Sequence, residues 1–135
     1  MKAKTFTEID FLVNFHFIEE NLPFNPQNIA DIILDSSDYF TSPHFIEDAI
    51  TVCRELGVDI NSFKSIKQGL LGFNFSHEEK AIIGFKSDQE EIAHTIFHEL
   101  YELLVRSYNK HAVVKVQENE ADADTFANIL IRKYS

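Results

Sequence analysis

Apolar residues in the first part of the chain are spaced as in helices. Residues 8–20 group their apolar side chains in a way that suits a helix better than a strand. Pro23 and Pro26 end this segment, because the residue before a proline avoids helical backbone angles. A short second helix is expected over residues 27–35.

A third helix is predicted to begin at Ser42-Pro43. Ser42 has the side chain of an N-cap, and Pro43 suits the first helical position. Gly57 stands where a C-terminal cap glycine belongs. The apolar residues between them fall on one face: Phe45, Ile46, Ala49, Ile50, Cys53 and Leu56.

The pattern changes in the middle of the chain. Two short apolar runs, at residues 69–75 and 80–85, are separated by the polar residues 76–79. Runs of this length around a polar turn predict a β-hairpin.

Two longer helices are predicted after the hairpin. Ser87 and Glu90 have capping-box spacing, which predicts a helix over residues 88–108. After a loop, a last helix is expected over residues 116–133, with cationic residues at its end where the helix dipole favours them.

This order of elements predicts one α+β domain spanning residues 1–135. N-terminal helices come first, then a small antiparallel β-hairpin or sheet, and last the two longer helices. A length of 135 residues fits one domain, and a hydrophobic content of 44% suffices for a core.

Charge and composition restrict the classes of function. Asp and Glu number 22 against 12 Lys and Arg, so the net charge of -10 argues against direct binding to nucleic acid or to an anionic membrane surface. Acidic residues near the N-terminus do not suit a signal peptide, and no apolar stretch approaches the roughly 20 residues of a membrane span. A cytoplasmic protein is expected. Cys53 is the only cysteine, which excludes an intrachain disulfide and an all-cysteine zinc site.

The predicted helix over residues 88–108 has a core face and a chemically distinct polar face. The core face holds Ile92, Ala93, Ile96, Phe97, Leu100, Leu103 and Leu104. His94, His98 and Glu102 follow one another at single-turn intervals on another face, with Glu99 beside them. About 12 Å of helix axis separates His94 from Glu102, so one metal ion would bind either between His94 and His98 or between His98 and Glu102. The simpler interpretation is a solvated polar face.

The last helix carries an acidic cluster. Favourable placement in a first helical turn is its simplest explanation. The apolar arc consists of Ala123, Phe126, Ala127 and Leu130. Glu120 lies nearest the centre of this arc, and a carboxylate carried inward requires a cation or a hydrogen-bond partner. Asp124 lies one turn further on the same side, whereas Asp122 falls on the opposite flank and is the second choice for a ligand. One helix with a His and one with an inward carboxylate is a geometry that binds zinc.

Both helices resemble those of a known enzyme family. Residues 93–104 read AHTIFHELYELL and are similar to the active-site helix of the ImmA/IrrE zinc metallopeptidases, which reads roughly T-x-A-H-E-L-G-H-L-L. About twenty residues later that family has E-x-[ED]-A-[DN]-x-F-A, and residues 120–127 here read EADADTFA. The two hairpin segments also look like the family's strands. The resemblance covers about residues 44–133.

The resemblance implies a set of site residues. His98 matches the first metal ligand, Glu99 the general base that activates water, and Glu120 the third ligand. Asp124 matches a position from which a carboxylate orients a ligating imidazole. Glu102 stands where the family has its second His ligand.

The replacement of the family's second His by Glu102 bears on which metal the site prefers and on whether it hydrolyses peptides. Zinc is the metal that the family implies, and a set of His98, Glu102 and Glu120 suits Mn²⁺ or Fe²⁺ relatively better than a two-His set does. Tyr101 also replaces a family glycine. Either the site still binds metal and hydrolyses peptides, or it has lost hydrolysis and only the fold is kept.

The resemblance implies a peptidase that makes limited cuts in a protein partner such as a transcriptional repressor. No helix-turn-helix is apparent, so that repressor would be a separate chain. The alternative is a degenerate, non-catalytic family member that binds its partner without cutting it.

Overall fold

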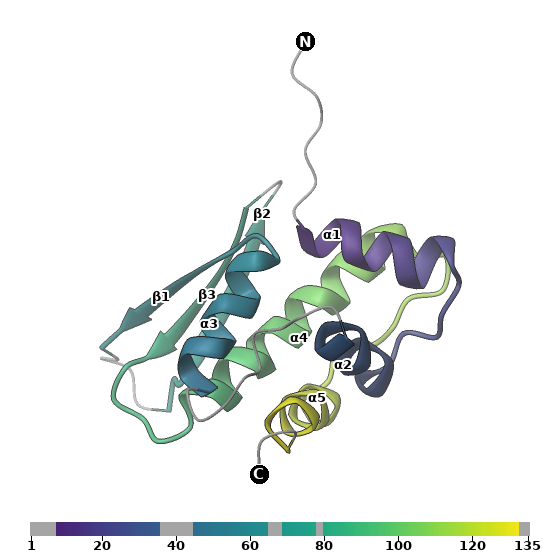
Figure 1. The fold of residues 1–135 in the computed structure, drawn as a ribbon. Coiled ribbons are helices and arrows are strands. Elements are labelled where there is room, and N and C mark those ends of the chain that lie inside the picture. Colours follow the sequence, from purple (N-terminus) through teal and green to yellow (C-terminus); the bar gives the residue numbers. More distant parts are fainter. Residues whose placement is uncertain (1–7, 36–44, 65–68, 78–79, 133–135) are drawn as a thin grey trace.

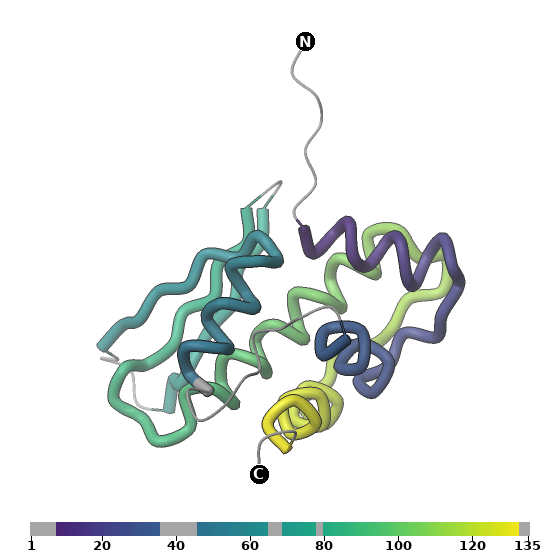
Figure 2. The backbone as a smooth tube through the Cα atoms, in the orientation of Figure 1, coloured from purple at the N-terminus to yellow at the C-terminus, as the bar shows by residue number. Residues whose placement is uncertain are grey.

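The computed structural model describes residues 8–35, 45–64, 69–77 and 80–132, and Figures 1 and 2 show their path. The elements in chain order are the helix α1 (Glu8–Val13), the π-helix η1 (Asn14–Glu19), α2 (Pro26–Asp35), α3 (Phe45–Glu55), β1 (Val58–Phe63), β2 (Gly72–His77), β3 (Lys80–Lys86), α4 (Ile92–His111) and α5 (Glu120–Arg132). The predicted α+β class is confirmed. The cap proposed at Ser42 lies outside the described residues.

The sheet is mixed rather than purely antiparallel. Its strand order is β1-β3-β2, and the predicted hairpin of β2 and β3 is antiparallel, with Phe73 opposite Gly84. The strand β1, which the sequence pattern did not predict, pairs parallel to β3 with Ile60 opposite Ile83. The apolar residues of β1 are only Val58, Ile60 and Phe63, so its alternating pattern is too short to stand out.

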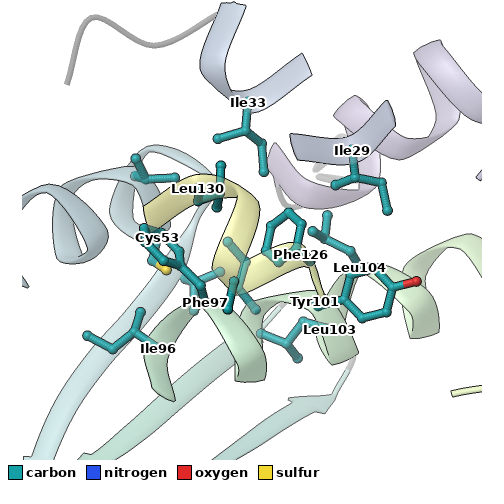
Figure 3. Close-up of a cluster of buried hydrophobic side chains, with 14 of the residues drawn as sticks. Ile29, Ile33, Cys53, Ile96, Phe97, Tyr101, Leu103, Leu104, Phe126 and Leu130 are labelled. Atoms are coloured by element: carbon teal, nitrogen blue, oxygen red, sulfur yellow. The ribbon is translucent and has the colours of Figure 1, made fainter. Parts of the chain in front are cut away.

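Helix α4 is the centre of the fold. It packs against β2, β3, α3 and α5, and the ribbon in Figure 1 shows it between the sheet and the other helices. Its predicted core face is largely confirmed, since six of the seven residues named above are buried and Ile92 is partly buried. The predicted apolar arc of α5 is also confirmed, since Ala123, Phe126, Ala127 and Leu130 are fully buried. Figure 3 labels Phe126 and Leu130 among the buried side chains.

The start of α4 differs from the prediction. The helix begins at Ile92 rather than at residue 88, and Glu91 at the N-cap makes no side-chain cap bond. The capping box of Ser87 and Glu90 is therefore not formed. The Ser87 hydroxyl instead donates to the carbonyl of Phe63 at the end of β1, so a contact distant in sequence replaces the local cap.

Helix α5 also begins later than predicted. It starts at Glu120 rather than at residue 116, because Asn119 caps it: the Asn119 Oδ1 accepts a hydrogen bond from the backbone N–H of Asp122 at 2.8 Å. Glu118 consequently lies in the loop before the helix. Helix α4 meanwhile continues to His111, three residues past its predicted end.

The N-terminal helices complete the core around α4 and α5. Helix α2 packs on α5 through Ile29 and Ile33, which Figure 3 shows beside Phe126 and Leu130. The buried carboxylate of Asp10 on α1 accepts hydrogen bonds from Ser107 and Lys110 of α4. Within the described part of the chain, no helix combines the length and the apolar character needed to cross a membrane.

Candidate metal centre

Packing of α4 along α5 brings His98 to the acidic start of α5. The His98 Nε2 lies 2.6 Å from Glu120 Oε2 and 3.6 Å from Asp124 Oδ1. The Glu120 side chain is nevertheless 78% exposed. The expectation that Glu120 is carried inward is therefore wrong about its burial, because it reaches the imidazole from the solvent side. The motif of residues 93–104 on α4 and the motif of residues 120–127 on α5 are thus in contact through His98 and Glu120.

The other ring nitrogen of His98 faces two carboxylates of its own helix. Its Nδ1 lies 3.2 Å from Glu99 Oε2 and 3.4 Å from Glu102 Oε1. These side chains are only 12% and 15% exposed, and that of His98 is 14% exposed. Ligand atoms of these three residues lie within 4.8 Å of one another, close enough to hold a metal ion.

The His98 ring therefore lies between two acidic groups, Glu99 with Glu102 on one side and Glu120 with Asp124 on the other. A metal ion bonds to only one of the two ring nitrogens, and Glu102 and Glu120 face different ones. As the ring stands, a single ion does not reach His98, Glu102 and Glu120 together. That ligand set requires the imidazole to turn.

Strand β2 holds the Glu99 carboxylate. The Asn74 Nδ2 donates a hydrogen bond of 2.8 Å to Glu99 Oε1. The strand comes close to α4 because Gly72 has no side chain: a Cβ there would lie 2.5 Å from Thr95 Cγ2. Sequence reasoning missed Asn74. Its signal was a polar residue between Phe73 and Phe75, at the position where alternation turns the side chain toward the core side.

The acidic groups change the protonation of the metal-free cluster. The hydrogen bond to Glu99 and the charges of Glu120 and Glu99 raise the pKa of His98 to about 9, against the opposing effect of burial. Burial, a hydrogen bond with Glu118 and the charge of Glu99 raise the pKa of Glu102 to about 8. Both shifts favour the positively charged form of His98 and the protonated form of Glu102, which compensates part of the acidic charge without a metal.

A surface cleft of about 350 Å³ opens beside this cluster. Residues 69–72 form one wall, while the N-terminal half of α4 and the start of α5 form the other. The lining side chains include His94, His98, Glu99, Glu120 and Asp124, together with Leu70 and Leu71. Glu102 is not among the lining residues.

His94 and Asp122 occupy different surroundings. The His94 Nε2 lies 3.8 Å from Asp124 Oδ1, so this histidine faces the same end of α5 as His98 does. Asp122 lies at the start of α5 and stabilises it, because its carboxylate accepts a hydrogen bond of 2.9 Å from the Asn119 side chain. Its charge also contributes to raising the pKa of the buried Tyr101.

The donor atoms suit a divalent metal. Imidazole nitrogen and carboxylate oxygen are ordinary ligands of Zn²⁺, and they converge on the cleft from two packed helices. A search of family models, of curated proteins and of solved structures found no match to this chain.

Proposed function

We propose that the protein is a metal-dependent peptidase that makes limited cuts in a protein partner. The observation that carries the proposal is the approach of His98 Nε2 to Glu120 Oε2 across two helices, at a cleft that Glu99 also lines. A histidine, a carboxylate from a second helix and an adjacent glutamate are the components of a hydrolytic zinc site. The motif resemblance to the ImmA/IrrE peptidases supports the same class.

Each residue has a role in this proposal. His98 and Glu120 hold the ion, with zinc the first choice and Mn²⁺ or Fe²⁺ the alternatives. A bound divalent ion supplies a Lewis acid that polarises a carbonyl and lowers the pKa of water. Glu99 takes a proton from the attacking water and returns it to the departing amine. Asn74 keeps the Glu99 carboxylate in place through its hydrogen bond.

The cleft suits a peptide segment of a larger protein. It is open at the surface, and the exposed side chains of Leu70 and Leu71 offer contacts for apolar residues of the substrate. An exposed loop of a folded partner, such as a transcriptional repressor, fits a site of this kind, and cutting it there gives limited proteolysis.

One observation favours a second candidate, a non-catalytic protein-binding module. Both ring nitrogens of His98 already have carboxylate partners, Glu99 at Nδ1 and Glu120 at Nε2, so the cluster can compensate part of its charge without a metal. In this alternative the protein binds the same kind of partner without hydrolysis.

The experiment compares the wild type with Glu99→Gln. Metal-free protein is titrated with ZnCl₂ by calorimetry, and the zinc-loaded protein is incubated with a synthetic peptide library whose products are identified by mass spectrometry. We expect Glu99→Gln to bind zinc, since the Gln side-chain oxygen can still accept a hydrogen bond from His98 Nδ1, and to cut peptides about 10²–10⁴-fold more slowly, because the proton acceptor is lost. Glu90→Gln, the same change at an exposed residue just before α4, should cut at the wild-type rate.

The outcomes separate the candidates. Zinc binding without any cut in the library supports the binding module. Equal cutting by the wild type and Glu99→Gln would show that Glu99 is not the base. Absence of binding to both Zn²⁺ and Mn²⁺ rules out the metal-dependent peptidase.

A further inference from the structure

We propose that the metal ion is held by two residues one turn apart on each helix, His94 and His98 from α4 with Glu120 and Asp124 from α5, and that Glu102 is not a ligand. This inference rests on the proposed metal dependence and specifies its site. It differs from the ligand set that the motif resemblance implies, because it replaces Glu102 by His94.

The distances around Asp124 are the first support for this ligand set. Its Oδ1 lies 3.6 Å from His98 Nε2 and 3.8 Å from His94 Nε2, so the two imidazoles direct the same type of nitrogen at one carboxylate. The fourth member, Glu120, is already 2.6 Å from His98 Nε2. Four donors at ~2.1 Å around a tetrahedral zinc ion lie about 3.4 Å apart. Three of the six donor pairs are therefore 2.6–3.8 Å apart, whereas the ring centroids of His94 and His98 are 6.4 Å apart, so the two imidazoles must turn toward each other to share one ion.

Access to the cleft carries the second step. His94, His98, Glu120 and Asp124 all line the cleft, whereas Glu102 does not. An ion on the Nδ1 side of His98 would be coordinated by nearly buried carboxylates of one helix. An ion on the Nε2 side faces the open space where a peptide and water arrive. A catalytic zinc ion usually has three protein ligands and leaves its fourth position to water or substrate, so one of the two exposed carboxylates would give way when water binds.

The second nitrogen of His98 carries the third step. A metal-bound histidine usually donates its other ring N–H to a carboxylate, which fixes the tautomer and the ring orientation. The Nδ1 of His98 has such a partner in Glu99 at 3.2 Å, with Glu102 next at 3.4 Å. Glu102 can therefore hold the His98 Nδ1–H when the Glu99 carboxylate turns into the cleft to act as the base, and the His98 Nε2 remains directed at α5.

The first test is zinc titration of metal-free protein by calorimetry. We expect His94→Ala to weaken zinc binding by at least about 10-fold, and Glu102→Gln to weaken it less, because Glu99 still holds Nδ1. His111→Ala is the matched control: it makes the same change at an exposed position of the same helix, and it should bind zinc like the wild type. Glu102→His should not tighten binding, although it would do so if residue 102 were a ligand.

The second test identifies the metal-bound nitrogen without any assay of activity. In ¹⁵N-labelled protein, long-range proton–nitrogen spectra of the imidazoles distinguish a metal-bound nitrogen from one that carries a proton. On addition of Zn²⁺ we expect His94 and His98 both to bind through Nε2, with His98 keeping its proton on Nδ1.

Two results overturn the inference. If Glu102→Gln loses zinc while His94→Ala keeps it, or if His98 binds through Nδ1, the ligand set is wrong and the metal-dependent peptidase still stands. If the wild type binds neither Zn²⁺ nor Mn²⁺, the ligand set and the proposed function are both wrong.

Discussion

At the scale of single residues, His98 decides how the site is organised. Its two nitrogens face different pairs of carboxylates, one on its own helix and one on α5. A proton or a metal ion at Nε2 would therefore compensate the same negative charge, because either one places positive charge next to Glu120 and Asp124. Metal binding, as proposed above, would compete with protonation at this nitrogen.

The raised pKa values predict that the metal-free protein loses stability as the pH rises. The pKa of His98 increases from 6.5 to about 9 on folding, so its contribution is complete below pH 6.5 and is lost toward pH 9. The pKa of Glu102 increases from 4.5 to about 8, and the stability gained from keeping its proton is lost between those values. Between pH 6.5 and 8, both groups lower the free energy of unfolding as the pH rises.

Thermal unfolding in EDTA over this pH range measures the effect. We expect the midpoint temperature to fall steadily from pH 6.5 to 9. Glu102→Gln, which cannot titrate at that position, should show a smaller decrease. A midpoint that is constant or rises across the range contradicts the assignment.

At the scale of elements, the close approach of β2 to α4 positions the Glu99 carboxylate. Gly72 provides the space for it, since a Cβ there would lie 2.5 Å from Thr95 Cγ2 and 3.2 Å from the carbonyl oxygen of Gly84. Two residues further along the strand, Asn74 reaches Glu99. The separation of strand and helix thus determines whether this hydrogen bond forms.

Gly72→Ala is expected to destabilise the protein by roughly 1–3 kcal/mol, because the added methyl group pushes β2 and α4 apart. Urea denaturation measures the loss. Thr95→Ser removes the methyl group that the new Cβ meets and keeps the hydroxyl that donates to Gln89, so the double variant should recover part of the stability. Equal stability of Gly72→Ala and the wild type would mean that the contact is easily relieved.

At the scale of the whole molecule, the aromatic core fixes α5 against the rest of the fold. Phe126 is fully buried and its ring lies 5.4 Å from that of Tyr101, which in turn lies 6.3 Å from Phe24 (Figure 3 labels Phe126 and Tyr101). Tyr101, which stands where the similar ImmA/IrrE motif has a glycine, is therefore part of the core. The N-terminal segment and both site helices share one packed unit.

Phe126→Ala is expected to cost about 3–5 kcal/mol of the free energy of unfolding, since it leaves a cavity between α5 and α4. Asn128→Ala, at an exposed position of the same helix, should change stability by less than about 0.5 kcal/mol. Urea denaturation followed by circular dichroism compares the two variants. A loss below about 1 kcal/mol for Phe126→Ala contradicts the proposed role of this ring.

Local patterns in the sequence were sufficient for the helices and for most of the candidate residues. The spacing of apolar residues predicted the buried faces of α4 and α5, and the two motifs pointed to His98, Glu99 and Glu120, because helical periodicity depends on residues only a few positions apart. The capping prediction at Ser87 failed for the opposite reason: a carbonyl of β1, distant in the sequence, took its hydroxyl.

Tertiary structure alone decided the rest. The parallel pairing of β1, the hydrogen bond from Asn74 and the separation of Glu102 from the cleft all depend on segments that meet only after folding. The orientation of the His98 ring also depends on contacts between segments that are distant in the sequence. The sequence shows that residue 98 is a histidine. The carboxylates that surround its ring from two helices determine which nitrogen faces the open cleft.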